Sequence, residues 1–350
     1  LKSPDIEDLK DLTIWVWTES LWAPITFTRA ALSEDASNGG SRYSSDEWRD
    51  WWCSDDAAVY QFIGQDNIFF YCIVQNPLWD ALDWGLITDT PVANYHILFM
   101  NKKASSSGAI KPPMAEELLE FYTPEQLRAH WLSLGLDQRA VSFSPKAFDT
   151  SVSRKGKDGE PDLLVKDDPR VVDPALKESA FLTNIFNRMA RSCLYGAANA
   201  CGGHLPISEP HQEVIDAAQE VLLKYEQLAY SFDAHSALAA VDEYARAENK
   251  RWGEASKAAQ GNDEAYDQAL ADAFYALKTI TLLMHPAVPE GCERIADALN
   301  FPHEEFFSWE NAFMGPKELA AKLGQSAEEH QLEELPPRFD FFKAHPSQKN

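Results

Sequence analysis

A basic, serine-rich stretch, "NKKASSSGAIKPP" at residues 101–113, lies within a chain that is otherwise strongly acidic. It holds two lysines, three consecutive serines and a glycine, and it directly follows the apolar run "NYHILFM" at residues 94–100. Such a run is typical of a strand buried in a sheet. In open α/β sheets, ligands bind beyond the carboxyl ends of the strands. The stretch is therefore a candidate binding loop, and the alternative is a solvated surface loop.

A second candidate loop, "GQDN" at residues 64–67, separates two apolar runs in "VYQFIGQDNIFFYCIV" at residues 59–74. The two runs predict two strands, and "LTIWVWT" at residues 12–18 predicts another because it is rich in aromatic and β-branched residues. Continuous apolar runs favour a parallel sheet covered by helices on both faces. The first ~110 residues are therefore expected to form an α/β layer.

The pattern becomes helical from residue 114 onward. Thr123 and Gln126 form a predicted capping box, and Asp173-Pro174 predicts the start of another helix. Apolar residues then recur with a 3.6-residue period in residues 214–228, as they do in 273–284. Residues 170–300 are expected to form an antiparallel helical bundle. The charged, aperiodic residues 150–170 are expected to form a linker or an exposed insertion, and "GPKELAAKL" predicts one short late helix.

Composition limits the function classes. The chain has 350 residues with 45% hydrophobic content, which predicts two or three domains with sizeable cores. Its net charge of −24 excludes a general nucleic-acid coating protein, although a few local cations could still hold a nucleic acid.

The five cysteines are scattered and include no Cys-x-x-Cys, so we expect reduced thiols and a cytoplasmic location. Cys201-Gly-Gly-His204 resembles half of a metal site but has no second pair nearby, and an ordinary loop is the simpler interpretation. The sequence shows neither an apolar run of membrane-spanning length nor a signal-peptide pattern. It does not start with Met, so we expect a fragment or a processed product.

Six stretches in colinear order resemble segments of the methionyl-tRNA synthetases, a class I aminoacyl-tRNA synthetase family. The resemblance runs from about residue 12 to about residue 300 and covers the later part of that family's chain. The most specific match is "FIGQDNIFFYCI", which is similar to the family's Phe-Ile-Gly-Lys-Asp-Asn-Ile-x-Phe-His-Cys-Ile. The others are "IWVWTESLWAPITFT", "ANYHILFMNKKASSSGA", "TNIFNRMARS", "AENKRWGEA" and "LLMHPAVPEGCERIADAL".

The resemblance implies a set of catalytic-domain residues. The implied substrate-binding residues are Trp17, Asp66, Asn67, Phe70 and Tyr71, and the implied ATP-binding residues are Gly64 and Lys103. The opening stretch then corresponds to the family's KMSKS loop, here Lys103, Ala104, Ser105, Ser106 and Ser107. Attack of a carboxylate on ATP concentrates charge on the departing pyrophosphate, which ammonium and hydroxyl groups stabilise. Lys103 and the three serines are therefore the predicted catalytic residues.

The resemblance also implies a tRNA anticodon-binding set in the helical part: Asn184, Arg188 and Trp252. Asn184 and Arg188 are four residues apart and so share one helix face. Trp252 is the predicted aromatic that stacks on a base, because loop bases are recognised by stacking and by hydrogen bonds to their edges. This prediction requires that Trp252 be exposed in the free protein. The structural alternative is a packed Trp and an ordinary solvated helix face.

The implied architecture is α/β plus all-α. It comprises the second half of a Rossmann-like catalytic domain (residues 1–110), a stem-contact region and linker (111–170) and an antiparallel α-helical anticodon-binding bundle (171–350). The implied reaction is ATP-dependent ligation of methionine to tRNA through an aminoacyl-adenylate, with Mg²⁺ accompanying ATP and no zinc site in this segment. The partners are tRNA, methionine, ATP and the missing N-terminal half of the catalytic domain, which carries His-x-Gly-His.

The chain departs from the family at Gln65, Tyr71, Gln75 and Ser106, where the family has Lys, His, an aromatic residue and Lys. Without its N-terminal half, the chain is expected to be inactive alone. The departures and the acidic charge leave a second interpretation open, a divergent synthetase-like binding or regulatory protein without tRNA charging.

Overall fold

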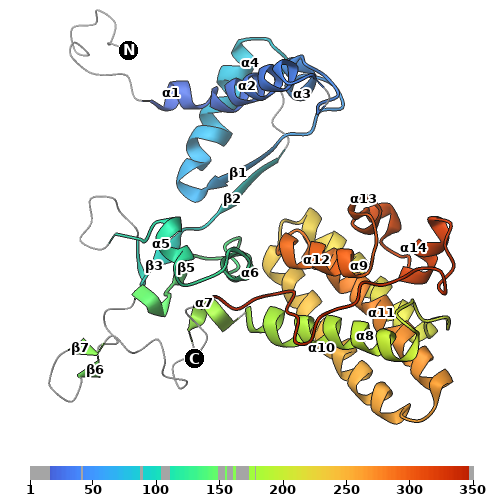
Figure 1. The fold of residues 1–350 in the computed structure, drawn as a ribbon. Helices are drawn as coiled ribbons and strands as arrows, with labels where there is room; N and C mark the ends of the chain where they lie inside the picture. Colours follow the sequence, from blue (N-terminus) through green and yellow to red (C-terminus); the bar gives the residue numbers. More distant parts are fainter. Residues whose placement is uncertain are drawn as a thin grey trace, which may run out of the picture. The chain divides into compact units, whose positions relative to one another are not determined.

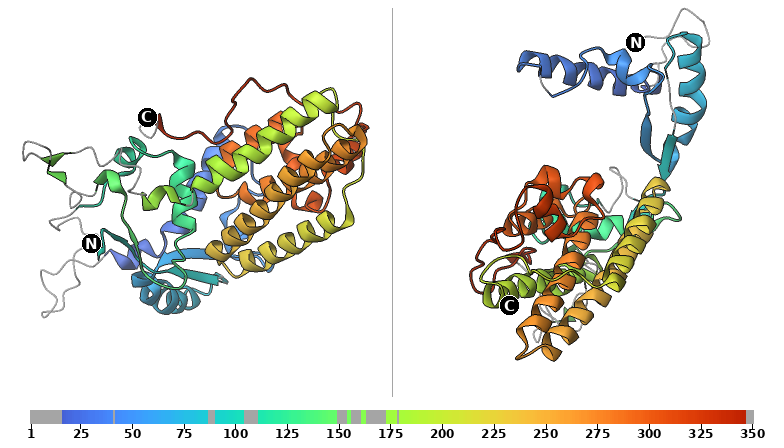
Figure 2. Two further views of the ribbon diagram at one scale, coloured as in Figure 1. Left: turned by 90° about the horizontal axis from the view of Figure 1, so that it is seen from below. Right: turned by 90° about the vertical axis from the view of Figure 1, so that its right-hand side faces the viewer.

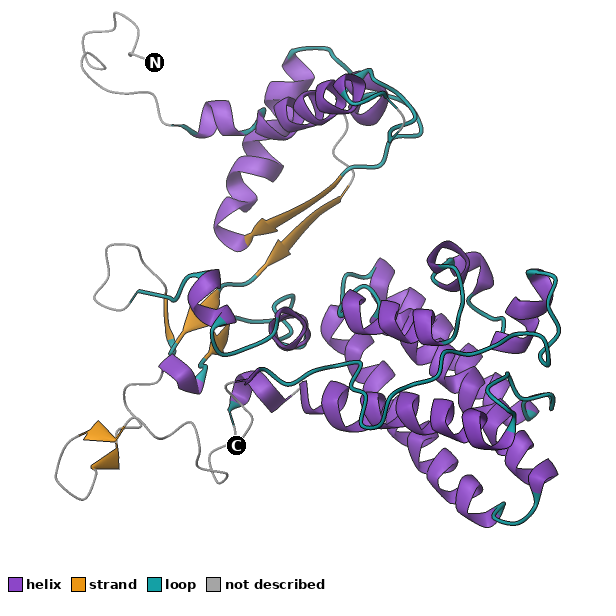
Figure 3. Cartoon of the chain, in the orientation of Figure 1, coloured by secondary structure: helices purple, strands orange, loops and turns teal. Residues whose placement is uncertain are grey.

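A computed structural model describes residues 16–40, 42–86, 90–103, 111–148, 154–155, 161–162, 173–177 and 179–346 (Figure 1). The chain divides into two compact units, Leu1–His96 (unit 1) and Ile97–Asn350 (unit 2), and each is described by itself. Helices predominate in both, and the strands form small sheets (Figure 3). No helix of the described residues is long and apolar enough to cross a membrane.

Unit 1 contains a parallel pair of strands, β1 and β2, which pair from Tyr60↔Thr90 to Gly64↔Asn94. A helical segment connects them, as parallel strands require a crossover. The strands are β1 (Tyr60–Gly64) and β2 (Thr90–Asn94), and the helices are α1 (Trp17–Ser20), α2 (Ala23–Ser37), α3 (Trp48–Trp52), the 3₁₀ turn η2 (Gln65–Asn67), the π-helix η3 (Phe69–Val74) and α4 (Gln75–Ala81).

The core of unit 1 is small and aromatic. Its buried members are Ile25, Trp52, Val59 and Trp79. The indole N–H of Trp52 donates to Thr28 Oγ1 at 2.9 Å, which joins α3 to α2. Large flat side chains therefore supply most of the apolar area that holds these short elements together.

Two predicted strands of unit 1 are wrong where the structure describes them. Trp17–Ser20, at the end of the run 12–18, forms helix α1, in which Ser20 Oγ donates to the Trp17 carbonyl. Residues 12–15 lie outside the described residues. The second apolar run, Phe69–Val74, forms a π-helix that continues into α4. A short continuous apolar run does not distinguish a buried strand from a helix, so neighbouring packing decides.

Unit 2 begins with a three-stranded sheet of order β4-β3-β5, in which β3 pairs antiparallel with β4 and parallel with β5. The predicted capping box is confirmed, since Thr123 Oγ1 accepts from the Gln126 N–H and Gln126 Oε1 accepts from the Thr123 N–H. The elements are β3 (Ile97–Phe99), β4 (Lys102–Lys103), α5 (Ala115–Leu119), α6 (Pro124–Leu132), β5 (Val141–Phe143), η4 (Lys146–Phe148), β6 (Arg154–Lys155), β7 (Pro161–Asp162) and α7 (Pro174–Lys177).

A helical bundle forms the rest of unit 2, as predicted from the 3.6-residue period (Figure 2). Helix α11 lies at its centre, because every residue from Ala269 to Met284 is buried. The elements are the π-helix η6 (Phe181–Phe186), α8 (Asn187–Ala200), α9 (Gln212–Tyr230), α10 (Ala234–Ala258), α11 (Asp263–Met284), α12 (Pro289–Ala298), α13 (His303–Phe306), η7 (Trp309–Asn311) and α14 (Pro316–Lys322). Helix α14 falls at the predicted short helix.

Helix α6 is attached to the bundle by polar contacts. Arg128 donates to the backbone carbonyls of Pro286 and Ala287 at 2.8 Å. Glu125 accepts from the Gly291 N–H at 2.7 Å, and burial raises the pKa of its carboxyl group. These contacts fix α6 at one end of the bundle. The three-domain division predicted from the sequence stays a prediction, since the structure separates only the two units.

Candidate functional site

The three aromatic residues predicted to bind the substrate lie together in unit 1. The rings of Trp17 and Phe70 are stacked, with centroids 4.1 Å apart and planes 6° apart. The ring of Tyr71 lies edge-on to Trp17 at 6.4 Å. Trp17 comes from α1 and the other two from η3, and all three are half-buried. The arrangement is a compact aromatic group, suited to contact with a small ligand that has an apolar side chain.

The turn after β1 holds the other predicted residues of this site. Asp66 and Asn67 lie in the 3₁₀ turn that follows Gly64 at the carboxyl end of the strand. A Cβ atom on Gly64 would lie 2.9 Å from Asp66 Oδ1, so a glycine is needed for the carboxylate to approach the strand end. Asp66 is exposed and Asn67 is half-buried, which leaves polar side chains at the position where open α/β sheets bind ligands.

A cavity of 580 Å³ adjoins this aromatic group. Tyr71 lines it together with Thr28, Trp52 and Gln61 from α2, α3 and β1. Gln61 is buried and donates to Gln75 Oε1 at 3.0 Å, and Gln75 in turn donates to the Leu21 carbonyl. Gln75, which replaces an aromatic residue of the family, is therefore a buried link between three segments and not part of the exposed aromatic surface.

Lys103, the predicted phosphate-binding lysine, lies in unit 2 on the β3–β4 hairpin, which has a two-residue turn. Met100 and Asn101 both have positive φ, 50° and 63°, as a type I′ turn requires, and Phe99 pairs with Lys102 across it. The Asn101 N–H donates to Ser142 Oγ at 2.8 Å, which attaches the turn to β5. Lys103 is exposed on β4. The predicted catalytic residues Ser105, Ser106 and Ser107 lie outside the described residues.

Asn184 and Arg188, two of the predicted anticodon-binding residues, are both exposed. Asn184 lies in the π-helix η6 and Arg188 in the first turn of α8. Neighbouring Asn187 is instead buried and donates to Asp340 Oδ1 at 2.8 Å. Asn184 and Arg188 therefore face solvent, whereas Asn187 between them binds the C-terminal residues.

Trp252 contradicts the prediction that an exposed indole stacks on a base. Its side chain is only 6% exposed, and its indole N–H donates to Ser192 Oγ at 2.7 Å. The ring lies edge-on to Tyr266 at 5.8 Å and in contact range of Gly196. A Cβ atom at Gly196 would be crowded by Leu270 and Tyr266, at 3.0 and 3.1 Å, and would lie at an ordinary 3.6 Å from the Trp252 ring. Trp252 is thus a packing residue of the bundle.

Two π-helical turns, η3 and η6, hold predicted site residues, and sequence reasoning missed both. Phe70 and Tyr71 lie in the first turn, and Asn184 lies in the second. Inserted π turns occur often at functional sites because the extra residue redirects neighbouring side chains. The sequence signal was limited to aromatic and β-branched residues in a run without clear helical periodicity.

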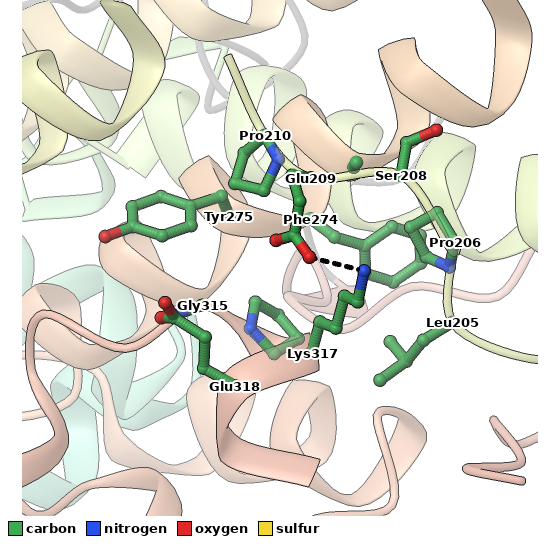
Figure 4. Close-up of a pocket in the computed structure, with 12 residues that line it drawn as sticks. Leu205, Pro206, Ser208, Glu209, Pro210, Phe274, Tyr275, Gly315, Lys317 and Glu318 are labelled. Atoms are coloured by element: carbon green, nitrogen blue, oxygen red, sulfur yellow. Dashed lines mark hydrogen bonds and ion pairs between the residues drawn. The ribbon is translucent and has the colours of Figure 1, made fainter. Parts of the chain in front are cut away.

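A small cavity near α14 is a structural joint. It is lined by residues of the loop before α9, of α11 and of α14, and its space of about 20 Å³ holds about one water molecule (Figure 4). Lys317 crosses its opening, with Nζ 2.6 Å from Glu209 Oε1 and 2.5 Å from the Ile207 carbonyl. These contacts connect α14 to that loop, and we assign no substrate to this cavity.

Within the described part of the chain, no group of three or more His, Cys, Asp or Glu side chains could hold a metal ion. In Cys201-Gly-Gly-His204, the thiol of Cys201 lies 3.5 Å from Asp267 Oδ1. Burial and the Asp267 carboxylate raise the pKa of this thiol to about 12, so it is neutral at pH 7. This segment follows α8 as a loop.

Comparison with known proteins finds similarity to one group of enzymes. The family model described as tRNA synthetases class I (M) matches residues 2–155. The methionine–tRNA ligase of Methanoculleus marisnigri is 23% identical over 298 residues, which cover 83% of this chain and 39% of that protein. The methionine–tRNA ligase of Thermococcus onnurineus is 25% identical over 330 residues, covering 87% and 39%. The chain is similar to methionine–tRNA ligases along most of its length. It spans about two fifths of the length of these curated relatives.

Solved structures show the same fold. The Mycobacterium tuberculosis methionyl-tRNA synthetase bound by methionyl-adenylate matches with a TM-score of 0.64 at 18% identity, over 94% of this chain and 56% of that one. The free form of that enzyme matches with a TM-score of 0.62 at 16% identity, over 98% and 59%. The fold of the chain is therefore that of a class I synthetase, with many helices and small sheets.

Proposed function

We propose that this chain is the later part of a methionine–tRNA ligase, which joins methionine to tRNA through an aminoacyl-adenylate at the expense of ATP. The observation that carries the proposal is the stack of Trp17 on Phe70 with Tyr71 edge-on. These residues were selected from the sequence as the methionine-binding set, and they come from two separate elements. A half-buried aromatic group suits a thioether side chain, because sulfur packs favourably against aromatic rings.

In this proposal unit 1 and the hairpin of β3 and β4 belong to the second half of a Rossmann-like catalytic domain, and the bundle binds the anticodon. The domain bounds are then residues 1–110, 111–170 and 171–350. The Lys103 ammonium group and the serines at 105–107 stabilise the departing pyrophosphate of Mg²⁺-ATP. The activity further needs the part of the catalytic domain that carries His-x-Gly-His, which is absent from this sequence.

The proposed anticodon contacts are Asn184 and Arg188, which are exposed four residues apart. An amide and a guanidinium group together can form hydrogen bonds to the edges of unstacked bases and to phosphate. Trp252 has no direct part in this contact, because its ring is buried.

The test is binding of a fluorescently labelled anticodon stem–loop of methionine tRNA to the chain, measured by anisotropy at fixed salt. We expect saturable binding that the double variant N184A/R188A weakens by at least about tenfold, from the loss of charge-assisted hydrogen bonds. The matched control is Lys250→Ala, which removes an exposed cation from α10. Equal affinity for a stem–loop with an unrelated anticodon would contradict the proposal.

The catalytic half of the proposal needs a second measurement. The chain alone is expected to show no methionine-dependent ATP–pyrophosphate exchange. Supplied with a separately produced N-terminal half of a methionyl-tRNA synthetase catalytic domain, it should gain exchange, and K103A should reduce that exchange about 10²–10³-fold. Anticodon binding without any exchange in the supplemented protein would instead favour the binding-module interpretation.

A further inference from the structure

A cavity of 240 Å³ lies in unit 2 between α6 and α10. Its apolar lining comes from α6, η6, α10 and the end of α11, with Ala129, Phe181, Leu238 and Met284 as the main contributors. Phe181 and Met284 also belong to the bundle core, so this wall is held in place. The cavity is smaller than most drug-binding pockets and therefore suits a small ligand.

Cationic side chains surround the opening of this cavity. Lys177, at the end of α7, is exposed and makes no ion pair with any described residue. Arg246, on α10, is 53% exposed and uses Nε to contact Asp242 Oδ1 at 2.8 Å, which leaves its terminal amino groups available. His235 also lines the opening, and its Nδ1 contacts the Ser133 carbonyl, which orients the ring.

This concentration of cations is unusual for the chain as a whole, which carries a net charge of −24. Asp242 is the only carboxylate among the lining residues, against Lys177 and Arg246. An exposed Arg and an exposed Lys that line an apolar cavity form a complementary site for an anionic group attached to an apolar body. Among such ligands, a nucleotide combines a flat base with a phosphate that both cations can contact.

We propose that this cavity binds a nucleotide, with the base against the wall formed by Phe181, Leu238 and Met284 and the phosphate between Lys177 and Arg246. The phosphate has two sources, a free mononucleotide or one nucleotide of a bound RNA strand. The lining of the cavity includes neither the aromatic residues Trp17, Phe70 and Tyr71 nor Asn184 and Arg188. The site therefore stands or falls independently of the proposed ligase function.

The test is isothermal titration of the whole chain with AMP, adenosine and inorganic phosphate, and with a short single-stranded RNA. AMP should bind more tightly than either adenosine or phosphate. The double variant K177A/R246A should weaken AMP at least about tenfold, because two charge-assisted contacts are lost. Asp242→Asn should strengthen AMP about two- to fivefold, because the only carboxylate of the lining is neutralised.

Lys250→Ala is the matched control, because Lys250 is an exposed cation of the same helix, contacts Glu254 at 3.9 Å and does not line the cavity. It should leave the affinity for AMP unchanged. Ala239→Phe, which fills the opening without removing a charge, should weaken AMP while phosphate binding stays as it is. This variant separates a site for base and phosphate from a merely cationic surface.

If RNA binding depends on Lys177 and Arg246 while AMP does not bind, the site is supported and the strand is the source of the phosphate. If AMP binds with the predicted variant dependence, a free nucleotide is the source. AMP and RNA affinities that both survive K177A/R246A would overturn the proposal. AMP bound at another site of the chain would be insensitive to K177A/R246A, so this variant distinguishes such a site from the cavity between α6 and α10.

Discussion

The two units bury their apolar residues to very different extents. In the bundle, a single cluster joins α8, α9, α10, α11 and α12, and Phe274, Leu277 and Ile280 of α11 are almost completely buried. In unit 1 the buried cluster consists of four residues, and Phe27, Phe69 and Ile73 are 70%, 56% and 59% exposed. Stability scales with buried apolar area, so it is concentrated in the bundle. Unit 1 has the exposed apolar area that is typical of a binding surface.

The largest expected effect is that of Trp252→Ala on the bundle. The change removes a buried indole and its hydrogen bond to Ser192, and leaves a cavity against Gly196. The free energy of unfolding of the bundle should fall by about 3–5 kcal/mol, while an unfolding transition of unit 1 stays in place. Denaturant titration followed by circular dichroism measures both.

Trp79→Ala is the reciprocal control, since it removes a buried indole from unit 1. It should lower the denaturant concentration at which unit 1 unfolds and leave the unfolding transition of the bundle unchanged. A single transition that both variants shift equally would show that the two units unfold as one, and the comparison would fail.

The next effect concerns Gly291, the residue of α12 on which the C-terminal residues pack. A Cβ atom there would lie 2.0 Å from a ring carbon of Phe342, which is itself 2% exposed. Gly291→Ala should therefore destabilise the bundle by about 1–3 kcal/mol and release residues near Phe342 to proteolysis. Gly253→Ala is the control, since nothing lies near a Cβ at that helical position, and it should stabilise α10 by up to about 1 kcal/mol.

A smaller effect depends on pH through Lys278 in α11. Burial lowers the pKa of its amino group to about 8, and the group donates to the carbonyls of Asn311 and Ala312. The folded state therefore binds fewer protons than the unfolded state between pH 8 and 10.5, and this lysine contributes stability that grows as pH rises through that window. Relative to Lys278→Met, the wild type should gain about 1.5 kcal/mol between pH 8 and 9.5.

The difference between the two proteins is the quantity to measure, because the cysteines act in the opposite direction. Burial raises the pKa of the Cys201 thiol to about 12, so the unfolded state loses this proton first and stability falls as pH rises. That contribution is common to the wild type and to Lys278→Met and cancels in the comparison. An unchanged difference across the window would show that the folded lysine keeps its ordinary pKa.

Sequence patterns predicted the bundle better than unit 1, for physical reasons. Helices such as α9 can be predicted from the local periodicity of their apolar residues. The capping box at Thr123 is also a local signal, because its two residues are three positions apart. The π-helix Phe69–Val74 and the short helix at Trp17 are instead decided by contacts between distant segments. The burial of Trp252 likewise depends on Ser192 and Gly196 of another helix, which no local pattern shows.

Only those residues of the candidate site that belong to a sequence motif could be predicted. The grouping of Trp17, Phe70 and Tyr71 follows the resemblance to the synthetases. The cavity between α6 and α10 has no motif, because Lys177 and Arg246 come from separate helices and meet only through the packing of the bundle.

The smallest expected effect is that of a substitution in the aromatic group of unit 1. Trp17→Leu keeps an apolar side chain but removes the ring that stacks on Phe70 at 4.1 Å. An aromatic pair contributes about 0.5–1.5 kcal/mol beyond the area it buries, and Trp17 is only half-buried, so the unfolding transition of unit 1 should fall by no more than this. Scanning calorimetry measures it, with the bundle transition as the internal reference. A shift as large as that of Trp79→Ala would mean that the stack is part of the core of unit 1. A small shift together with lost methionine-dependent exchange in the supplemented protein would mean that the ring is retained for binding and contributes little to folding.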